Sequence, residues 1–291
     1  MSEPKQIRTL TVIGAGAMGR GIAFCGLAAG YEVRLTDANA DQAKAGLDWI
    51  VQRAERDGID PRGISVVDGI GAACAEVDIV IEAVVERLDV KVAVFKAAAA
   101  ASAHAVLASN TSGIPVSLIG EGVGDPGRVV GMHFFNPVPK MRLCEIVVGK
   151  ETSDEAIAVA TAVAQKMGKT PVQTGDTPGF LASRINCAVG NEALRMLEQG
   201  VASAEAIDTA VKLGLNYPMG PLELLDLVGL DVRLNALETL NGAYGGGFAP
   251  TSIHRQLVEQ GRLGVKTKAG IYDYDAAGKK APGSGVVPAA T

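Results

Sequence analysis

Cysteine and histidine are both scarce in this sequence of 291 residues, and their spacing excludes the common metal sites. The four cysteines, Cys25, Cys74, Cys144 and Cys187, form no C-x-x-C pair, and none has a neighbouring histidine at metal-ligand spacing. We therefore expect reduced thiols in the core and no metal site.

The sequence also lacks a long apolar run and an excess of positive charge. Its most apolar window, residues 97–108, is alanine-rich and contains Ser102 and His104, whereas a membrane-spanning helix needs about 20 strongly apolar residues. The opening MSEPKQIRTLTVIG has no apolar stretch ahead of a cleavage site. The formal net charge is -5, whereas domains that bind nucleic acid usually carry a basic face. We expect a cytoplasmic protein with no membrane segment and no nucleic-acid partner.

The first 175 residues contain short apolar runs that alternate with helical patterns, as in the βαβ units of a parallel sheet. The predicted strands are Thr9–Ile13, Glu32–Thr36, Ile79–Glu82, Val106–Ser109, Val129–His133 and Cys144–Val148. The predicted helices are Ala17–Ala29, Asp41–Arg56, Val90–Ala101 and Asp154–Met167.

The pattern changes after Pro178-Gly179, where apolar residues recur at helical spacing and no convincing strand follows. The predicted helices of this part are Phe180–Leu197, Ala204–Leu213, Leu222–Leu240 and Ser252–Gln260. We expect an α/β domain at residues 1–182, an all-helical domain at residues 183–277 and a disordered tail at residues 278–291, which is rich in Gly, Pro and Ala.

A glycine motif follows the first predicted strand and opens the first predicted helix. The motif fits G-x-G-x-x-G and consists of Gly14, Ala15, Gly16, Ala17, Met18 and Gly19. Its first glycine permits a tight turn, its second lets the backbone approach a pyrophosphate, and its third lets helix and strand pack closely. The positive end of the helix dipole attracts the phosphate charge. The motif in this position predicts a Rossmann-type, doubly wound, mainly parallel sheet that binds a dinucleotide.

Asp37 follows the second predicted strand, close to where an acidic residue accepts hydrogen bonds from the adenosine ribose. Its charge would repel a 2'-phosphate, so we expect NAD rather than NADP. The alternative is a glycine turn in an unrelated α/β protein, with Asp37 an ordinary loop residue.

Three polar residues lie at or beyond neighbouring strands near the carboxyl edge of the predicted sheet, where ligands gather in this type of fold. Ser112 follows one strand, His133 ends the next, and Glu145 lies in the strand after that. Oxidation of a secondary alcohol needs a base for the hydroxyl proton, and an imidazole suits this role. A carboxylate such as Glu145 would orient the ring and stabilise its protonated form. Taken alone, a His among Met and Phe is more often a core residue than a catalyst, and Glu145 could simply be a charge at a strand end. We assign His104 and His254 to structure.

Motifs along nearly the whole chain resemble those of the L-3-hydroxyacyl-CoA dehydrogenases, in particular the bacterial 3-hydroxybutyryl-CoA dehydrogenases. They are VIGAGAMG, SNTS, GMHFFNPVPKM, GKTPV, DTPGF, YPMGPLELLDLVGLD and KT…GIYDY. HFFNP followed by PMGPLELLDLVGLD is highly specific for this family.

The resemblance implies NAD-dependent interconversion of a 3-hydroxyacyl-CoA thioester and its 3-oxo form, together with a role for each matching residue. Ser112 would hydrogen-bond the reacting oxygen, His133 would be the general base and Glu145 would pair with His133. Further cofactor contacts are implied for Glu86, Lys91, Ser112, Asn136 and Lys266.

The chain departs from the family pattern at Ser183, which stands where the family has an Asn that completes the substrate site. A Ser hydroxyl donates one hydrogen bond, whereas an Asn amide offers two donors and an acceptor on a longer arm. For this reason a catalytically weak NAD-binding protein of the same fold stays open as an alternative. A dehydrogenase of a sugar acid also stays open, because that activity occurs on a closely similar architecture.

The helical part carries more apolar residues than about 100 residues need for their own core, and such a surplus favours a symmetric partner. The residues concerned include Leu222, Leu224, Leu225, Leu227, Val228 and Leu230. The resemblance also implies a dimer through this domain.

Overall fold

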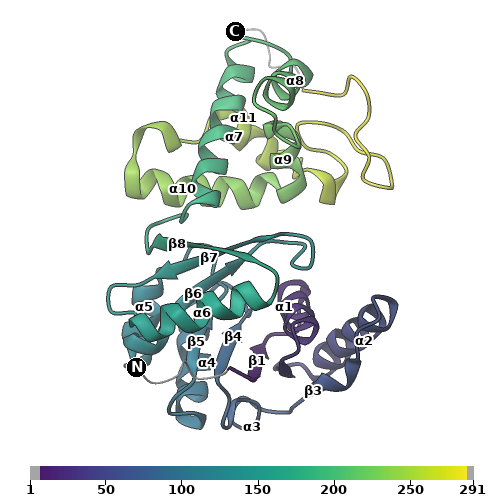
Figure 1. Cartoon of the computed structure of the whole chain (residues 1–291). Helices are drawn as coiled ribbons and strands as arrows, with labels where there is room; N and C mark the ends of the chain where they lie inside the picture. The colour runs from purple at the N-terminus through teal and green to yellow at the C-terminus, as the bar shows by residue number, and fades with distance from the viewer. Residues whose placement is uncertain (1–6, 287–291) are drawn as a thin grey trace. The chain divides into compact units, whose positions relative to one another are not determined.

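The computed structural model describes residues 7–286, and the chain separates into two units that divide after Phe180 (Figure 1). The sequence places this boundary after residue 182. All the strands named below lie in the first unit, and the second unit is built from helices. The expected fold class, a mainly parallel doubly wound sheet followed by a helical domain, is confirmed.

The first unit is built on one eight-stranded sheet with the strand order β3-β2-β1-β4-β5-β6-β7-β8. Neighbouring strands are parallel except for β6 and β7, which run antiparallel. The strands are β1 (Thr9–Ile13), β2 (Glu32–Thr36), β3 (Ile64–Val66), β4 (Ile79–Glu82), β5 (Val106–Ser109), β6 (Val129–Phe134), β7 (Leu143–Val148) and β8 (Thr170–Gly175). The six predicted strands are confirmed to within one residue at each end.

The two strands that the sequence did not predict, β3 and β8, form the edges of the sheet. Only Ile64 is buried in β3 and only Thr174 is buried in β8, and β8 also contains Pro171. An edge strand carries few core residues and tolerates proline because one side of its backbone is not paired. Neither segment therefore has the apolar pattern from which a strand is predicted.

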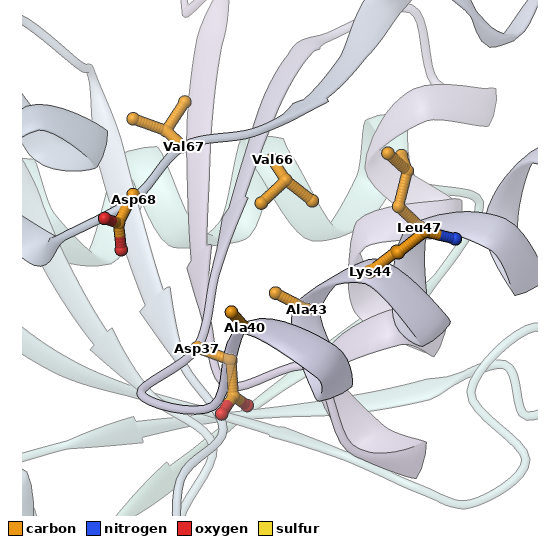
Figure 2. A pocket seen from close by; sticks show the side chains of 8 residues that line it. All are labelled: Asp37, Ala40, Ala43, Lys44, Leu47, Val66, Val67 and Asp68. Carbon is orange, nitrogen blue, oxygen red and sulfur yellow. The ribbon is translucent and has the colours of Figure 1, made fainter.

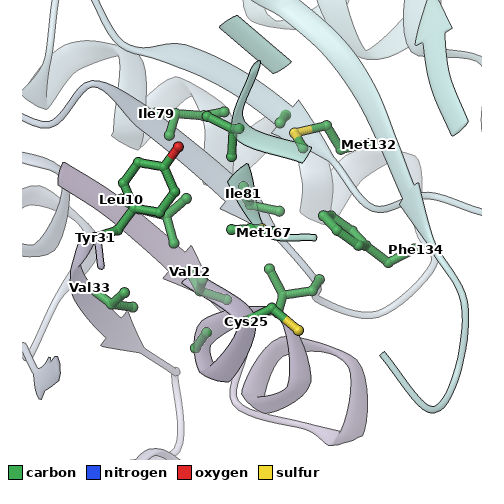
Figure 3. Packing of buried hydrophobic residues seen from close by; sticks show 14 of the residues in the cluster. Leu10, Val12, Cys25, Tyr31, Val33, Ile79, Ile81, Met132, Phe134 and Met167 are labelled. Carbon is green, nitrogen blue, oxygen red and sulfur yellow. The ribbon is translucent and has the colours of Figure 1, made fainter. Parts of the chain in front are cut away.

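Helices cover both faces of the sheet. One face is covered by α1 (Ala17–Ala28), α2 (Ala40–Arg56) and α6 (Asp154–Lys166), and the other by α3 (Ile70–Cys74), α4 (Leu88–Ala101) and α5 (Val116–Val123). Side chains of β4 alternate between the two cores: Ile79 and Ile81 belong to the first and Val80 to the second. Figure 3 shows part of the first core. The short helices α3 and α5 were not predicted.

The second unit contains five helices in the described residues: α7 (Ala182–Glu198), α8 (Ala204–Gly214), α9 (Pro221–Val228), α10 (Leu230–Tyr244) and α11 (Ser252–Glu259). The prediction of one helix over 222–240 is wrong. Gly229 adopts a φ of +109°, a conformation that a helix interior does not allow, and it separates α9 from α10.

Residues 7–286 also form four 3₁₀ turns, at Pro61–Gly63, Pro126–Arg128, Gly246–Phe248 and Val265–Thr267. Among the residues that the structure describes, no helix is both long enough and apolar enough to cross a membrane. The four cysteines are buried.

The segment 278–286 differs from the disordered tail that the composition predicts. The Ala281 amide donates to the Asp273 carbonyl at 2.9 Å, and the Val286 amide donates to the Ile271 carbonyl at 2.9 Å. The Gly285 amide donates to the Glu205 carboxylate at 3.0 Å. These bonds hold the segment on the helical unit, and composition alone could not predict them. The rest of the predicted tail, residues 287–291, lies outside the described residues.

Candidate active site

The glycine motif forms a turn. At two of its glycines the surrounding atoms leave no room for a side chain, and at the third there is open space beside the backbone. A Cβ atom on Gly14, whose φ is +100°, would lie 2.6 Å from the carbonyl oxygen of Ala83. A Cβ atom on Gly19 would lie 1.7 Å from the carbonyl oxygen of Gly14. At Gly16 the nearest atom to an added Cβ, on Gln42, would be 3.5 Å away. Gly16 therefore leaves its outer side open to a ligand.

Helix α1 begins directly after this turn, with Ala17 and Met18 in its first turn. No described side chain caps its N-terminus, and its first turn holds no acidic residue. The amide groups of this turn are thus available to an anion, and the dipole of the helix favours a negative charge there. The turn and the helix fit the pyrophosphate of a dinucleotide.

Asp37 follows β2 and is oriented by the same turn. Its Oδ2 accepts a hydrogen bond from the Ala15 amide at 2.7 Å, and its Oδ1 accepts one from the Asn39 amide at 2.9 Å. Each carboxylate oxygen keeps a second lone pair, which suits a ribose hydroxyl. An apolar hollow of about 260 Å³ lies beside Asp37, between α2 and the end of β3 (Figure 2). This hollow lies near the glycine turn, and neither His133 nor Glu145 lines it. It is therefore separate from the His133–Glu145 pair.

His133 and Glu145 form a buried pair near the carboxyl end of β6. The antiparallel register of β6 and β7 places the two residues directly opposite each other, a position from which side chains meet. The distance from His133 Nδ1 to Glu145 Oε2 is 2.6 Å. Glu145 is fully buried, and the His133 side chain is 8% exposed. Because a carboxylate only accepts hydrogen bonds, Nδ1 carries the proton, and the neutral ring keeps Nε2 as an acceptor.

Aromatic rings surround the imidazole of His133. The ring centroid of Phe135 lies 4.4 Å from that of His133, and the centroid of Phe180 lies 5.7 Å away. Asn136 lies just after β6 and is exposed, and a cis peptide bond joins it to Pro137. The imidazole is thus packed among aromatic rings and paired with a buried carboxylate.

Ser112 lies on the loop that follows β5, the strand beside β6 in the sheet. It is exposed, and Glu86 accepts hydrogen bonds from its amide at 2.8 Å and from its hydroxyl at 3.3 Å. Lys91 makes one ion pair with Glu86, at 3.2 Å, and a second one with Glu82. The Lys91 side chain is only 1% exposed. The structure therefore brings together Ser112, Glu86 and Lys91, and it places the ammonium group of Lys91 in the interior.

The remaining two predicted site residues belong to the second unit. Ser183 lies in the first turn of α7 and is partly exposed. Lys266 is half-exposed, and its ammonium group lies 2.6 Å from a carboxylate oxygen of Asp231.

Two residues near this edge of the sheet were not predicted. Glu82 ends β4 and is fully buried, and the side-chain oxygen of Asn110 accepts a hydrogen bond from the Phe134 amide at 2.9 Å. A signal for Glu82 was present, because a charged residue that ends an otherwise apolar strand needs a partner. No such signal exists for Asn110, which acts through the backbone of a distant segment.

The other histidines and the acidic residues offer no second centre in the described residues. His254 is buried, and its Nε2 lies 2.8 Å from the carbonyl oxygen of Leu230, so its role is structural. Among the residues from 7 to 286, no group of three or more His, Cys, Asp or Glu side chains is placed to hold a metal ion.

Comparison with known proteins agrees with this geometry over the length of the chain. Residues 9–177 match the NAD-binding domain of 3-hydroxyacyl-CoA dehydrogenase, and residues 179–274 match the C-terminal domain of that family. A probable 3-hydroxybutyryl-CoA dehydrogenase of Bacillus subtilis is 40% identical over 93% of this chain and 98% of its own. A 3-hydroxyadipyl-CoA dehydrogenase of Escherichia coli is 38% identical over 93% of this chain and 60% of its own.

A solved structure gives the same result for the fold. The crystal structure of an (S)-3-hydroxybutyryl-CoA dehydrogenase from Ralstonia eutropha aligns with a TM-score of 0.87 and 35% identity. The alignment covers 93% of this chain and the whole of that one. With a dinucleotide turn, a buried His–Glu pair and matches to both domains, the chain belongs to the 3-hydroxyacyl-CoA dehydrogenase family of NAD-dependent oxidoreductases.

Proposed function

We propose that this protein interconverts (S)-3-hydroxyacyl-CoA and 3-oxoacyl-CoA thioesters, with His133 as the proton-transfer residue. The observation that carries this proposal is the buried pair of His133 and Glu145, at the same edge of the sheet as the glycine turn. The glycine turn at Gly14–Gly19 and the Asp37 carboxylate would hold NAD, which would supply hydride-transfer chemistry at C3 of the substrate.

His133 takes the hydroxyl proton at Nε2 as the alcohol is oxidised. Because Nδ1 is held by Glu145 at 2.6 Å, the ring presents Nε2 and the positive charge that forms on it is stabilised by the buried carboxylate. In the reverse direction the protonated ring gives this proton to the ketone oxygen. Phe135 and Phe180 pack against the imidazole and keep water from part of its surface.

Ser112 is proposed to bind the reacting oxygen through its hydroxyl group. The loop that carries it follows β5, next to the strand that carries His133, and the hydroxyl is exposed. Asn136, which is also exposed after β6, is proposed as a cofactor contact. Ser183 and Lys266 of the second unit are proposed, on the resemblance, as a substrate and a cofactor contact.

Asp37 is proposed to select NAD. Its carboxylate is fixed by two backbone amides and would accept bonds from the ribose hydroxyls, while a 2'-phosphate at that position would meet a negative charge.

The acyl chain is proposed to be short, with the four-carbon thioester as the first substrate to try. The support is the likeness to relatives named 3-hydroxybutyryl-CoA dehydrogenases. The adipyl relative, at 38% identity, makes a six-carbon substrate with a distal carboxylate the second one to try.

We also propose a cytoplasmic homodimer that assembles through the helical unit. The apolar surplus is smaller than the sequence implies, because Leu222, Leu225 and Leu230 are buried in the core of the unit itself. Leu227 is nevertheless 55% exposed and Leu213 is 82% exposed. A second copy would cover such side chains. A monomeric mass at micromolar concentration, measured by light scattering, would contradict the dimer.

The direct test of the function is the oxidation of NADH by purified protein in the presence of acetoacetyl-CoA. Free acetoacetate and an oxidised sugar acid serve as the two comparison substrates. We expect rapid oxidation only with the thioester. Reaction with the sugar acid alone would favour a sugar-acid dehydrogenase, and cofactor binding without turnover would favour a catalytically weak NAD-binding protein.

A further inference from the structure

A buried network of charged and hydroxyl groups lies beneath the Ser112 loop. Its centre is Lys91, on the first turn of α4, which is 1% exposed. The ammonium group of Lys91 lies 2.8 Å and 3.0 Å from the two carboxylate oxygens of Glu82, and 3.2 Å from Oε2 of Glu86. These contacts hold the ammonium group between two carboxylates. At 1% exposure, the Lys91 side chain offers almost no surface to a ligand.

Glu86 connects this ammonium group to the loop. Its other oxygen, Oε1, accepts hydrogen bonds from the Thr111 hydroxyl at 2.7 Å, from the Ser112 amide at 2.8 Å and from the Gly113 amide at 3.2 Å. Burial raises the pKa of Glu86, but the charge of Lys91 and the bonds from Thr111 and Ser112 outweigh burial and lower the pKa below its ordinary value. Glu86 thus stays ionised at neutral pH and accepts all of these bonds.

Glu82 holds the base of the same loop. It is fully buried at the end of β4 and accepts a short hydrogen bond from the hydroxyl of Ser109, the last residue of β5. Its backbone carbonyl accepts a bond from the Asn110 amide at 3.0 Å. Side chain and backbone of Glu82 therefore fix the point at which the loop leaves the sheet.

We infer that Glu82 and Lys91 are positioning residues for the reaction, which act through Glu86 to hold the Ser112 hydroxyl in place. This inference rests on the proposed function. It assigns a role to Glu82 and changes the role of Lys91 from a cofactor contact to a support of the loop. A displaced hydroxyl lowers kcat, because a misplacement of about 1 Å costs on the order of a hundredfold in rate.

The test uses the full-length protein with Lys91→Met, Glu82→Gln and the double variant, and it measures kcat, KM, NADH affinity and melting temperature. The single Lys91→Met variant leaves Glu82 buried without its partner and is expected to lose stability. The double variant removes both charges and is expected to recover most of that stability. Arg34→Met is the matched control, because Arg34 is a partly buried cation of the same unit that bonds only to Ala73, Ala75 and Glu32.

We expect kcat for acetoacetyl-CoA reduction to fall by about tenfold to a hundredfold in the double variant, with NADH affinity nearly unchanged. The Arg34→Met control should keep its kcat. Recovery of kcat together with stability in the double variant would overturn the inference, since the network would then be only structural. A loss of NADH affinity as large as the loss of kcat would also overturn it, because Lys91 would then contact the cofactor.

Ser112→Ala separates this inference from the proposed function. If the network acts through Ser112, the double variant should lose little further kcat in the Ser112→Ala background. Independent, additive losses would overturn the positioning role while leaving the proposed function intact. If Ser112→Ala alone had no effect, the role of Ser112 and the positioning inference would both fail. If the unaltered protein reduced no thioester, the proposed function would fail instead.

Discussion

The two units of this protein bury charged side chains in different ways. In the Rossmann-type unit, Glu82, Lys91, His133 and Glu145 are all buried near the carboxyl ends of β4 and β6 and bond mainly to other side chains. In the helical unit, the buried Asp208 and Asp226 bond mainly to backbone amides and tyrosine hydroxyls.

The partners show what each set does. The Asp226 carboxylate accepts bonds from the amides of Ile271 and Tyr272 and from the hydroxyl of Tyr274, so it fixes the segment after the 3₁₀ turn at Val265–Thr267. Burial raises the pKa of Asp226 despite these bonds. Lys169 of the first unit follows the same structural pattern, because it donates to the carbonyl of Met141 at 3.0 Å. The first set therefore lies at the edge of the sheet where the site is proposed, whereas Asp208, Asp226 and Lys169 hold segments of backbone.

The largest expected effect is a loss of catalytic activity when a buried group at the sheet edge is replaced. His133→Gln should lower kcat by about 10²–10⁴ while leaving NADH affinity nearly intact, because proton transfer is lost. Glu145→Gln should lose part of that factor, because the imidazole is then less basic and less firmly oriented. Steady-state kinetics with acetoacetyl-CoA checks both. Near-normal turnover of the His133 variant would contradict the difference proposed between the buried groups of the two units.

The second effect should appear in stability. Asp226→Ala removes the acceptor of two buried amides and a tyrosine hydroxyl, and we expect a loss on the order of 3 kcal/mol in unfolding free energy. Urea denaturation measures this value. The matched control is Asp275→Ala, an exposed acid of the same unit, which should change stability much less. Equal losses in the two variants would show that the buried bonds add nothing.

A smaller effect concerns the choice of cofactor. Asp37→Ser should weaken NAD binding by about tenfold, because a hydrogen bond to a charged group contributes about 1.5–3 kcal/mol, and it should bind NADP more tightly than the unaltered protein. Fluorescence titration with both reduced cofactors gives the two affinities. Unchanged values for both would remove Asp37 from the site.

The smallest effect is a pH dependence of stability in the helical unit. Burial lowers the pKa of His254 below its ordinary value of 6.5, with the bond to the Leu230 carbonyl acting in the opposite sense. The folded state therefore binds fewer protons than the unfolded state, and this contribution is fully present above pH 6.5 and is lost as the pH falls. His254→Gln should reduce the slope of melting temperature between pH 7 and pH 5. An identical slope in the variant would contradict the assignment.

Much of the fold could be predicted from the sequence because the six inner strands are apolar and the helices are periodic. The split at Gly229 could not be predicted, because the apolar pattern runs through it while the positive φ is set by packing. Glu86 and Lys91 were identified only by resemblance, and their contacts with Glu82 and the Ser112 loop depend on segments up to 27 residues apart. His133 and Glu145 meet because they lie opposite each other on β6 and β7. This contact depends on the antiparallel register of the two strands, which the sequence did not predict.

The central claim is that His133 transfers the proton, and the pH dependence of the two reaction directions tests it most directly. Oxidation of the alcohol needs the neutral ring and should rise with pH, whereas reduction of the ketone needs the protonated ring and should fall with pH. Because the net oxidation releases a proton, the two directions respond oppositely to pH in any variant, and the diagnostic feature is where each rate levels off. Oxidation by the unaltered protein should level off at high pH and reduction at low pH, where the ring is wholly in the form that each direction needs. This levelling should be absent in His133→Gln. If the unaltered protein showed no levelling, or if the same levelling survived in the variant, His133 would not be the proton-transfer residue.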